Sequence, residues 1–409
     1  MATLIRWILP VLLLAGIDWY AFQTLQTAVS AYWVHQLFWA IAVAVYLSAI
    51  AVIVFGFRFK SNTARMYATA VFFIQFVFKL LLSLAALADD VMRLLRTLAM
   101  ALSSGFTGNV ELVERSALFC TISLILASVP MLAMIYGMLR NPYRYKVETV
   151  HLPIENLPNE LVGFTIVQIS DIHTGSFTQT KPLYRAVELI NQQQPDVVFF
   201  TGDLVNNHAF EAKPYLPIFA KITAQHGVFS VLGNHDYGDY VQWRNQQDYR
   251  QNFENMLQNH RQMGWHLLLN QHAVIRHNQH AIGIIGVENW SASPRFKKYG
   301  NLQTACQNLP QTTLNLLLSH DPSHWQAEVT QAFTHINATF SGHTHAFQFG
   351  INLPFFKWSP VRLMYKEWVG LYQQGKQYLY VNPGFGFVAY PGRVGFLPEI
   401  TVFKLGKKR

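Results

Sequence analysis

Four long apolar segments near the start of the chain constrain its fold most strongly. They cover Leu4–Leu25, Val34–Phe57, Met66–Ala88 and Ser116–Leu139. A helix needs about 20 mostly apolar residues to cross a hydrocarbon core about 30 Å thick, and each segment is long enough. Charged residues make up only 13% of the chain, and the deficit relative to an ordinary soluble protein lies in this part. We therefore predict a membrane region of four helices over residues 1–144, followed by a polar domain over residues 145–409.

Three features of this region leave alternatives open. The first segment could instead be a signal peptide because Arg6 precedes its apolar run, but three further spans follow and no small-residue cleavage site is evident. Asp18 and Lys79 lie inside proposed spans, where ionisable groups are costly and often functional. Asp18 is near the outer end of its span, however, and Lys79 could snorkel or lie between helices. The stretch Asp89–Leu102 is a candidate for an amphipathic helix on the outer surface.

The distribution of basic residues predicts the orientation of the spans. Two positive clusters, at residues 58–65 and 140–146, follow the second and fourth segments, whereas the loop after the first has no charge. Because cytoplasmic loops carry the excess of Lys and Arg, both clusters and the polar domain should face the cytoplasm. The clusters are Arg58, Lys60 and Arg65, then Arg140, Arg144 and Lys146. We expect a multi-pass protein of the inner (cytoplasmic) membrane.

The formal net charge of +9 fits contact of these clusters with anionic membrane lipids. Because no nucleic-acid-binding motif accompanies the charge, we expect no nucleic acid partner. The two cysteines, Cys120 and Cys306, fall in different halves of the chain, which argues against a disulfide framework.

The polar half has the texture of an α/β domain. Short apolar runs of strand length alternate with helical patterns, which predicts central strands covered by helices. The expected strands are Phe164–Ile169, Val197–Thr201, Val228–Leu232, Ile282–Val287, Leu314–Leu318, Ala338–Ser341 and Tyr378–Val381. The expected helices are Pro182–Gln193, Tyr215–Gln225, Trp243–Met263 and Trp325–Phe333.

Five of these strands run into short polar motifs. In order, the motifs are Asp171-Ile-His173, Gly202-Asp203, Gly233-Asn234-His235-Asp236, Ser319-His320-Asp321 and Gly342-His343-Thr-His345. Ligands of open α/β sheets bind beyond the carboxyl ends of the strands, so these side chains should meet at one edge. Carboxylate oxygen and imidazole nitrogen suit Mn, Fe, Zn or Ni. Asp203, with two oxygens, can bridge two ions, and two ions about 3.5–4 Å apart can clamp a phosphoryl group and activate a water.

These motifs, in this order, resemble the calcineurin-like metallophosphoesterase superfamily over roughly residues 150–405. The resemblance is close to a bacterial membrane-associated phosphodiesterase branch, whose members carry transmembrane segments ahead of the domain and end in a stretch like residues 390–400 here. It implies a four-layer α/β/β/α sandwich with two divalent metal ions. The implied ligands are Asp171, His173 and His345 for the first metal and Asn234, His320 and His343 for the second, with Asp203 bridging. His235 would be catalytic, stabilising the transition state or protonating the leaving oxygen.

The sequence departs from its relatives beside the last motif. Relatives often have two glycines and a glutamine after the second histidine, whereas this chain has Ala346, Phe347 and Gln348. The ligands are intact, but the bulk of Phe347 bears on substrate shape. The segment after Asp203 lacks the second Asp and the Arg of the protein-phosphatase branch, which argues against a phosphoprotein substrate.

Substrate contacts are harder to predict than metal ligands. Candidates are Asn207 and His208, which follow Asp203, and Arg393, which could instead form a structural ion pair. Glu288 and Asn289 end a strand at the same edge and could line the cleft. An aromatic cluster is either core or a contact for a membrane or an acyl chain. It comprises Phe355, Phe356, Trp358, Tyr365 and Trp368.

The resulting hypothesis is a membrane-anchored metal-dependent phosphoric ester hydrolase. It would cleave a phosphodiester or pyrophosphate, including a lipid-linked or nucleotide one, by attack of a water or hydroxide that bridges the metals. A phosphomonoesterase remains an alternative. A non-catalytic membrane sensor would be expected to lose residues such as Asp203 or Asn234, and both are present.

Overall fold

A computed structural model describes residues 2–55, 62–103 and 112–408 of the chain. The predicted positive residues Arg58 and Lys60 lie outside the described residues. The chain divides into two compact units, Met1–Gly137 and Met138–Arg409. The boundary that we expect after residue 144 stays a prediction.

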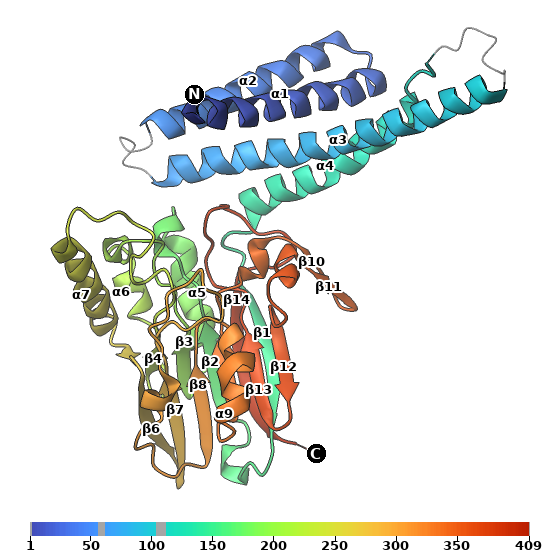
Figure 1. Ribbon diagram of the computed structural model, residues 1–409. Coiled ribbons are helices and arrows are strands. Elements are labelled where there is room, and N and C mark those ends of the chain that lie inside the picture. Colours follow the sequence, from blue (N-terminus) through green and yellow to red (C-terminus); the bar gives the residue numbers. More distant parts are fainter. Residues whose placement is uncertain (1, 56–61, 104–111, 409) are drawn as a thin grey trace. The chain divides into compact units, whose positions relative to one another are not determined.

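The amino-terminal unit is built from four helices, shown in blue to teal in Figure 1. They are α1 (Ala2–Ala28), α2 (Tyr32–Phe55), α3 (Asn62–Ser103) and α4 (Ala117–Arg140). Within the described residues, α2, α3 and α4 are long and apolar enough to cross a membrane. The helices share a small apolar cluster formed by Ala21, Leu25, Phe38, Leu82 and Ala127.

The third helix differs from the expected one. We expected a span ending at Ala88 and a separate amphipathic helix over Asp89–Leu102, but α3 runs without a break from Asn62 to Ser103. The segment contains neither Gly nor Pro, so nothing in it interrupts the backbone hydrogen bonds. Its acidic pair does not break the helix either, since Arg115 reaches Asp90 at 2.8 Å and Asp89 at 3.5 Å.

The carboxy-terminal unit contains two six-stranded sheets (Figure 1). The first has the order β1-β14-β2-β3-β4-β5 and the second β12-β13-β9-β8-β7-β6. The first sheet comprises β1 (Lys146–Ile154), β2 (Thr165–Ile169), β3 (Val197–Phe200), β4 (Val228–Ser230), β5 (His266–Leu267) and β14 (Glu399–Lys407). The second comprises β6 (Gln271–His277), β7 (His280–Gly286), β8 (Leu314–Leu318), β9 (Ala338–Ser341), β12 (Gly370–Gln374) and β13 (Gln377–Val381).

The main core lies between the two sheets. Buried residues of β2 and β3, such as Ile166 and Phe199, pack in one cluster with residues of β8 and β9, such as Leu316 and Phe340. The rings of Phe199 and Phe340 meet edge-on with centroids 5.1 Å apart. At roughly 25 cal/mol per Å² of buried apolar area, such a double layer of strands is a main source of folding free energy.

Helices cover the outer face of each sheet, which completes four layers. On the first sheet lie α5 (Lys181–Asn191), α6 (Leu216–Phe219) and α7 (Gln246–Gln262). His260 of α7 contacts β4, because its ring nitrogen lies 3.0 Å from the Ser230 hydroxyl. On the second sheet lie α8 (Leu302–Ala305), the π-helical turn Trp325–Val329 and α9 (Thr330–Ala332). The expected α/β sandwich is confirmed.

Two helices are shorter than the sequence pattern suggests. The helix expected over Tyr215–Gln225 contains only Leu216–Phe219 in α form. After Phe219, the side chain of Asn191 replaces helical hydrogen bonds. Its amide nitrogen donates to the Lys221 carbonyl, and its amide oxygen accepts from the Thr223 N–H. The other is α7, which begins three residues after Trp243 because the Asn245 side chain accepts from the Asp248 N–H and caps the helix.

Candidate metal centre

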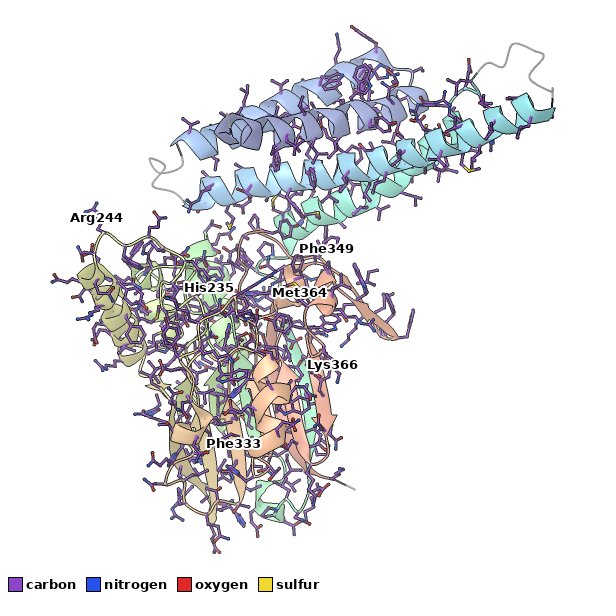
Figure 2. The ribbon with its side chains drawn as sticks, viewed as in Figure 1. His235, Arg244, Phe333, Phe349, Met364 and Lys366 are labelled. Carbon is purple, nitrogen blue, oxygen red and sulfur yellow. The ribbon has the colours of Figure 1, made fainter. Side chains whose placement is uncertain are left out.

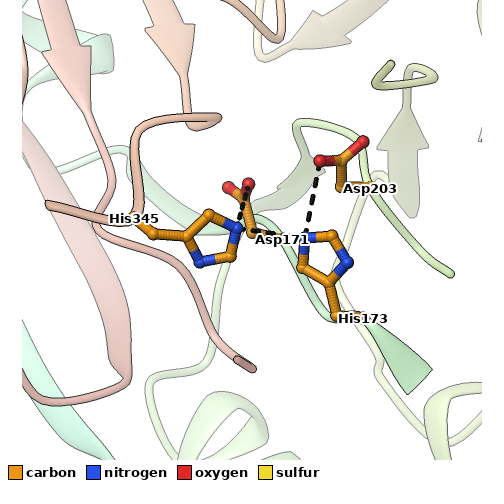
Figure 3. Close-up of side chains that lie close together, drawn as sticks. All are labelled: Asp171, His173, Asp203 and His345. Atoms are coloured by element: carbon orange, nitrogen blue, oxygen red, sulfur yellow. Dashed lines mark hydrogen bonds and ion pairs between the residues drawn. The ribbon is translucent and has the colours of Figure 1, made fainter. Parts of the chain in front are cut away.

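Four buried side chains from three loops converge in the carboxy-terminal unit (Figure 3). The Nε2 atoms of His173 and His345 are 3.0 Å apart. His345 Nε2 also lies 3.1 Å from Asp171 Oδ1, and His173 Nε2 lies 3.5 Å from Asp203 Oδ2. Ligands about 2.0–2.1 Å from one shared ion lie roughly 3.0–3.4 Å from each other, so the four atoms have the spacing of a coordination sphere.

A second group of candidate metal ligands shares Asp203 with the first. The same Oδ2 atom of Asp203 lies 3.2 Å from His320 Nε2. His343 Nδ1 lies 3.3 Å from His320 Nε2 and 2.8 Å from Asn234 Oδ1. The seven residues named as metal ligands from the sequence are therefore brought together in two groups that meet at Asp203.

The topology explains why these residues meet. Asp171, Asp203 and Asn234 follow β2, β3 and β4, which are neighbours and parallel in the first sheet. His320 and His343 follow β8 and β9, which are neighbours and parallel in the second sheet. All five loops leave the carboxyl ends of their strands, so the two sheets present them at the same edge of the sandwich.

The loops that carry the ligands have an unusual backbone. Five of the candidate ligands have positive φ: Asp171, His173, Asp203, His343 and His345. Non-glycine residues seldom adopt this conformation, and clusters of it occur mainly at functional sites. Gly202 has a φ of 98°, and a side chain there would meet the His320 ring and the Gly233 backbone. At Gly342 a side chain would clash with Ser170 and with the Asp171 carboxylate.

Neighbouring groups orient the histidine ligands. Asn206 Oδ1 lies 3.1 Å from His173 Nδ1, and the Thr201 carbonyl accepts from His320 Nδ1 at 2.7 Å. Both contacts leave Nε2 free to coordinate a metal ion. The ring of His343 is turned the other way, because its Nε2 lies 2.8 Å from the Tyr365 hydroxyl and its Nδ1 faces Asn234.

The charges of the centre favour cations. Burial lowers the pKa of His173 and of His343, so both stay neutral, as metal binding requires. Burial also opposes the charged form of His320, but Asp203 and then Asp171 outweigh it and raise the pKa of His320 to about 10. Although burial alone would raise the pKa of Asp203, the histidines around it, His320 first, hold that pKa well below its usual range.

The donor set fits exchangeable divalent ions. It consists of carboxylate oxygen, amide oxygen and imidazole nitrogen, which suit Mn, Fe, Zn or Ni. The buried His345 also has an Nδ1 atom without a hydrogen-bond partner among the described residues. Two imidazole nitrogens facing each other at 3.0 Å need either a proton or a cation between them.

Comparisons with known proteins agree with this geometry. The model of the calcineurin-like phosphoesterase family matches residues 164–347, from just before β2 to just after His345. A model described as "Probable Calcineurin-like phosphoesterase, transmembrane domain" matches residues 5–142. This chain belongs to the calcineurin-like metallophosphoesterases.

Several relatives of this metallophosphoesterase are named either as transmembrane proteins or as uncharacterised metallophosphoesterases. It is 28% identical over 274 residues to "Transmembrane protein with metallophosphoesterase domain" of Danio rerio, which covers 65% of this chain and 59% of the relative. It is 29% identical over 280 residues to "Uncharacterized metallophosphoesterase YkuE" of Bacillus subtilis, covering 66% and 89%. A 90-residue stretch, 21% of this chain and 27% of the relative, is 40% identical to "UDP-2,3-diacylglucosamine pyrophosphatase LpxG" of Chlamydia trachomatis.

His235, labelled in Figure 2, belongs to neither group of candidate ligands but contacts Asp203 and His173. Its backbone N–H donates to Asp203 Oδ1 at 2.9 Å, and its Nδ1 lies 2.6 Å from the Asn206 carbonyl. Because the carbonyl can only accept, Nδ1 carries the proton and Nε2 remains available. The ring lies 4.9 Å from that of His173 and 4.8 Å from that of Tyr240.

The predicted substrate residues have other partners. The ring of His208 packs against Phe210 and Trp243, and Glu211 accepts from the backbone N–H groups of Asn207 and His208. Arg393 is fully buried, and its guanidinium donates to the carbonyls of Pro383 and Gly386 at 2.5–2.9 Å. A contact of Arg393 with phosphate therefore has no support in this geometry.

Sequence reasoning missed three residues that support the ligands. Asn206 orients His173, and Tyr365 bonds to His343 and donates to Asp321 at 3.3 Å. Asp236 accepts four backbone N–H groups of the loops after β3 and β4, including that of Asp203 at 2.9 Å. Burial and the nearby Asp203 carboxylate raise the pKa of Asp236 to about 7. Only Asp236 stood in a recognisable motif, directly after His235.

Two cavities adjoin the centre. One of about 270 Å³ is lined by Asn234, Tyr240 and Asn289 together with Arg295 and Lys297. The other, about 840 Å³, also has Arg295 in its wall, with Phe296, Met364 and Tyr365. The Phe296 ring meets the His343 ring edge-on at 4.8 Å. Asn289 thus lines a cleft as we expected, whereas the Glu288 carboxylate accepts from Tyr237 and Asn270.

Proposed function

We propose that this protein hydrolyses a phosphodiester or pyrophosphate bond with two divalent metal ions held at the carboxyl ends of β2, β3, β4, β8 and β9. One observation carries the proposal: a single oxygen, Asp203 Oδ2, faces both His173 and His320, at 3.5 and 3.2 Å. A site for one ion would need no such shared carboxylate between two sets of ligands.

Each ligand has a separate role in this proposal. Asp171, His173 and His345 hold the first ion, and Asn234, His320 and His343 hold the second. Asp203 lies between the two sets and bridges them. When bound, the pair of ions supplies a Lewis-acid clamp on the phosphoryl oxygens and makes water a stronger nucleophile at neutral pH.

His235 is the proton donor in this proposal. Its Nδ1 proton is engaged by the Asn206 carbonyl, so a second proton on Nε2 can be released to the leaving oxygen. The backbone bond from His235 to Asp203 keeps the imidazole beside the bridging carboxylate. Protonation of a departing oxygen matters most when that oxygen is a poor leaving group.

The walls of the centre suit a substrate with more than one anionic or polar group. Arg295 borders both cavities, and Lys297 borders the one next to Asn234, where it pairs with Asp239 of the same wall at 2.7 Å. Cationic walls raise the local concentration of phosphate esters. The stretch similar to a diacylglucosamine pyrophosphatase supports a lipid-linked diphosphate as one candidate, and nucleotide-type diesters are the other.

Orientation in the membrane is a further part of the proposal. Basic residues Arg140, which ends α4, and Arg144, which follows it, precede the carboxy-terminal domain, which supports a cytoplasmic position on the inner membrane. Fusion of reporters after the last residue, Arg409, tests this. Green fluorescence without alkaline phosphatase activity is expected, and the reverse pattern would contradict a cytoplasmic domain.

A hydrolysis screen of the purified protein tests the activity itself. With Mn²⁺ added, we expect hydrolysis of diester or diphosphate substrates that chelator abolishes and fresh metal restores. The screen should compare a nitrophenyl diester, a nitrophenyl monoester, a dinucleotide and a lipid diphosphate. Preference for the monoester would replace the proposal with a phosphomonoesterase, and full activity after verified metal removal would refute it.

A further inference from the structure

A separate excursion of the chain leaves the catalytic domain directly after His345. It contains the hairpin β10 (Ile351–Leu353) and β11 (Phe356–Trp358), followed by the short helix η6 (Pro360–Leu363). Its strands pair only with each other and form a two-stranded sheet apart from the two large ones (Figure 1). A two-stranded hairpin of this kind is marginally stable in water without something to pack against.

The excursion exposes large apolar side chains. Phe355, at the turn of the hairpin, is 87% exposed, and Leu363, at the end of η6, is 86% exposed. Met364, labelled in Figure 2, is 59% exposed. Ile351, Leu353 and Phe356 are each more than two fifths exposed. Single exposed apolar residues are ordinary, but a group on one projecting element marks an interaction surface.

The exposed charges among these residues have one sign, although Lys366 also lies 3.8 Å from the Glu367 carboxylate. Lys357, Arg362 and Lys366 lie between and beside the apolar residues, and the acidic residue of the segment, Glu367, is buried. Lysine and arginine beside exposed apolar groups are typical of a surface that meets anionic headgroups and the upper part of the acyl chains. A surface for an acidic soluble partner would not need Phe355 and Leu363 at its most exposed points.

The base of the hairpin is tied to the end of the last membrane helix. Phe349 bridges to Val394, whose N–H donates to the Gln348 carbonyl at 2.8 Å, and the Gln348 amide donates to the Gly392 carbonyl at 3.0 Å. Gly392 packs against Met138 in the last turn of α4. Asn141, just after that turn, donates to the Arg393 carbonyl at 2.8 Å. The hairpin is therefore held by the loop that contacts the point where the chain leaves its last span.

We propose that this excursion is a bilayer-docking element: Phe355, Leu363 and Met364 enter the interface of the same membrane that holds the spans, and Lys357, Arg362 and Lys366 contact its anionic headgroups. Continuity with the exit of α4 identifies the bilayer as the occupant. The excursion also carries Tyr365, which bonds to His343, so docking would fix one wall of the metal centre against the membrane surface. This proposal does not depend on the reaction that the centre catalyses.

Spin labels on the full-length protein test the proposal. The two native cysteines, Cys120 and Cys306, are replaced by serine, and nitroxides are placed at Phe355→Cys, Leu363→Cys or Val162→Cys. Val162 is a matched control, because it is half exposed and apolar but precedes β2, away from the carboxyl end of that strand where the metal centre lies. The protein is reconstituted in nanodiscs of phosphatidylcholine with phosphatidylglycerol, and collisions with oxygen and with a water-soluble nickel chelate are measured.

Labels at positions 355 and 363 should collide several-fold more with oxygen than with the nickel chelate, and the label at 162 should show the reverse. Equal nickel access at all three positions would overturn the proposal. Dipolar broadening that disappears on dilution with unlabelled protein would also overturn it, because it would show a second copy on this surface. An unchanged circular dichroism spectrum checks that each labelled protein is folded.

The charged residues give an independent test. The triple variant Lys357→Gln, Arg362→Gln and Lys366→Gln should raise nickel access at position 355 in anionic nanodiscs. It should have little effect in discs of phosphatidylcholine alone, where no anionic headgroup is present. An equal change in both lipids, or no change in either, would contradict the contact with anionic headgroups.

Discussion

Buried carboxylates occur in both halves of this protein, but they are neutralised in different ways. In the helical unit, Asp18 lies 2.8 Å from Lys79, and Tyr46 donates to its other oxygen. In the carboxy-terminal domain, the ion-pair contacts of Asp171 and Asp203 among the described residues are all with histidines.

The pair in the helical unit is neutralised within the protein, which we call closed, whereas the histidine cluster can still accept cations, which we call open. A lysine carries a fixed charge and completes the pair with Asp18, so no ligand is needed. Imidazole is neutral when it acts as a ligand, and the carboxylates of the metal centre then keep a negative charge that cations can balance. The helical pair is therefore expected to serve stability, and the histidine-rich cluster to serve binding and chemistry.

Replacement of His235 should cause the largest loss of activity without loss of metal. We expect His235→Ala to lower the rate by about 10²–10⁴-fold, or roughly 3–5 kcal/mol of barrier, because general acid catalysis is removed. The loss should be greater for an alkoxide leaving group, which needs a proton, than for nitrophenolate. Turnover with the two kinds of substrate measures this, and an equal loss for both would argue against proton donation.

Breaking the closed pair should act on stability instead. Lys79→Met leaves Asp18 buried without its cation, so we expect a loss of about 3–5 kcal/mol in the free energy of unfolding. The double variant Asp18→Asn, Lys79→Met should recover most of it. Unfolding of the solubilised protein by denaturing detergent measures both. If Lys79→Met instead emptied the metal centre at unchanged stability, the division of roles between the two clusters would be wrong.

The smallest expected effect comes from removing a hydrogen bond that orients one of the proposed metal ligands. Tyr365→Phe removes the hydroxyl that bonds to His343 at 2.8 Å. Loss of such an orienting partner typically costs about 10–100-fold in metal affinity or activity. Metal titration followed by activity should show a weaker second site, while the first remains full. Phe296→Leu is a control, because this ring touches His343 without a hydrogen bond.

The convergence of the candidate ligands could be predicted from the sequence because each lies in a loop that follows a short apolar strand. Parallel strands bring such positions together whatever their distance along the chain. Their partners could not be predicted in this way. Asn206 and Tyr365 lie in irregular segments, and their contacts with His173 and His343 depend on loop conformations, some of them with positive φ, that no periodic pattern encodes.

Local sequence patterns also failed to predict an edge strand and the full length of a long helix. No strand was expected at β1, whose mostly exposed or half-buried residues pair in parallel with β14 from the far end of the chain. The pairing joins residues 146–154 to 399–407, so local periodicity does not reveal it. Conversely, charges at Asp89 and Asp90 suggested an end to the third span, but α3 continues because Arg115 and Arg93 pair with them.

Metal content of two matched variants tests the central claim most directly. Asp203→Ala removes the carboxylate shared by both ligand groups. His235→Ala changes a neighbouring side chain but keeps the backbone N–H of residue 235, which donates to Asp203. Elemental analysis of purified protein should find two ions per chain in the wild type and in His235→Ala, and a loss of at least one in Asp203→Ala. If His235→Ala lost metal as completely as Asp203→Ala, or if Asp203→Ala kept both ions, the two-metal centre bridged by Asp203 would be contradicted.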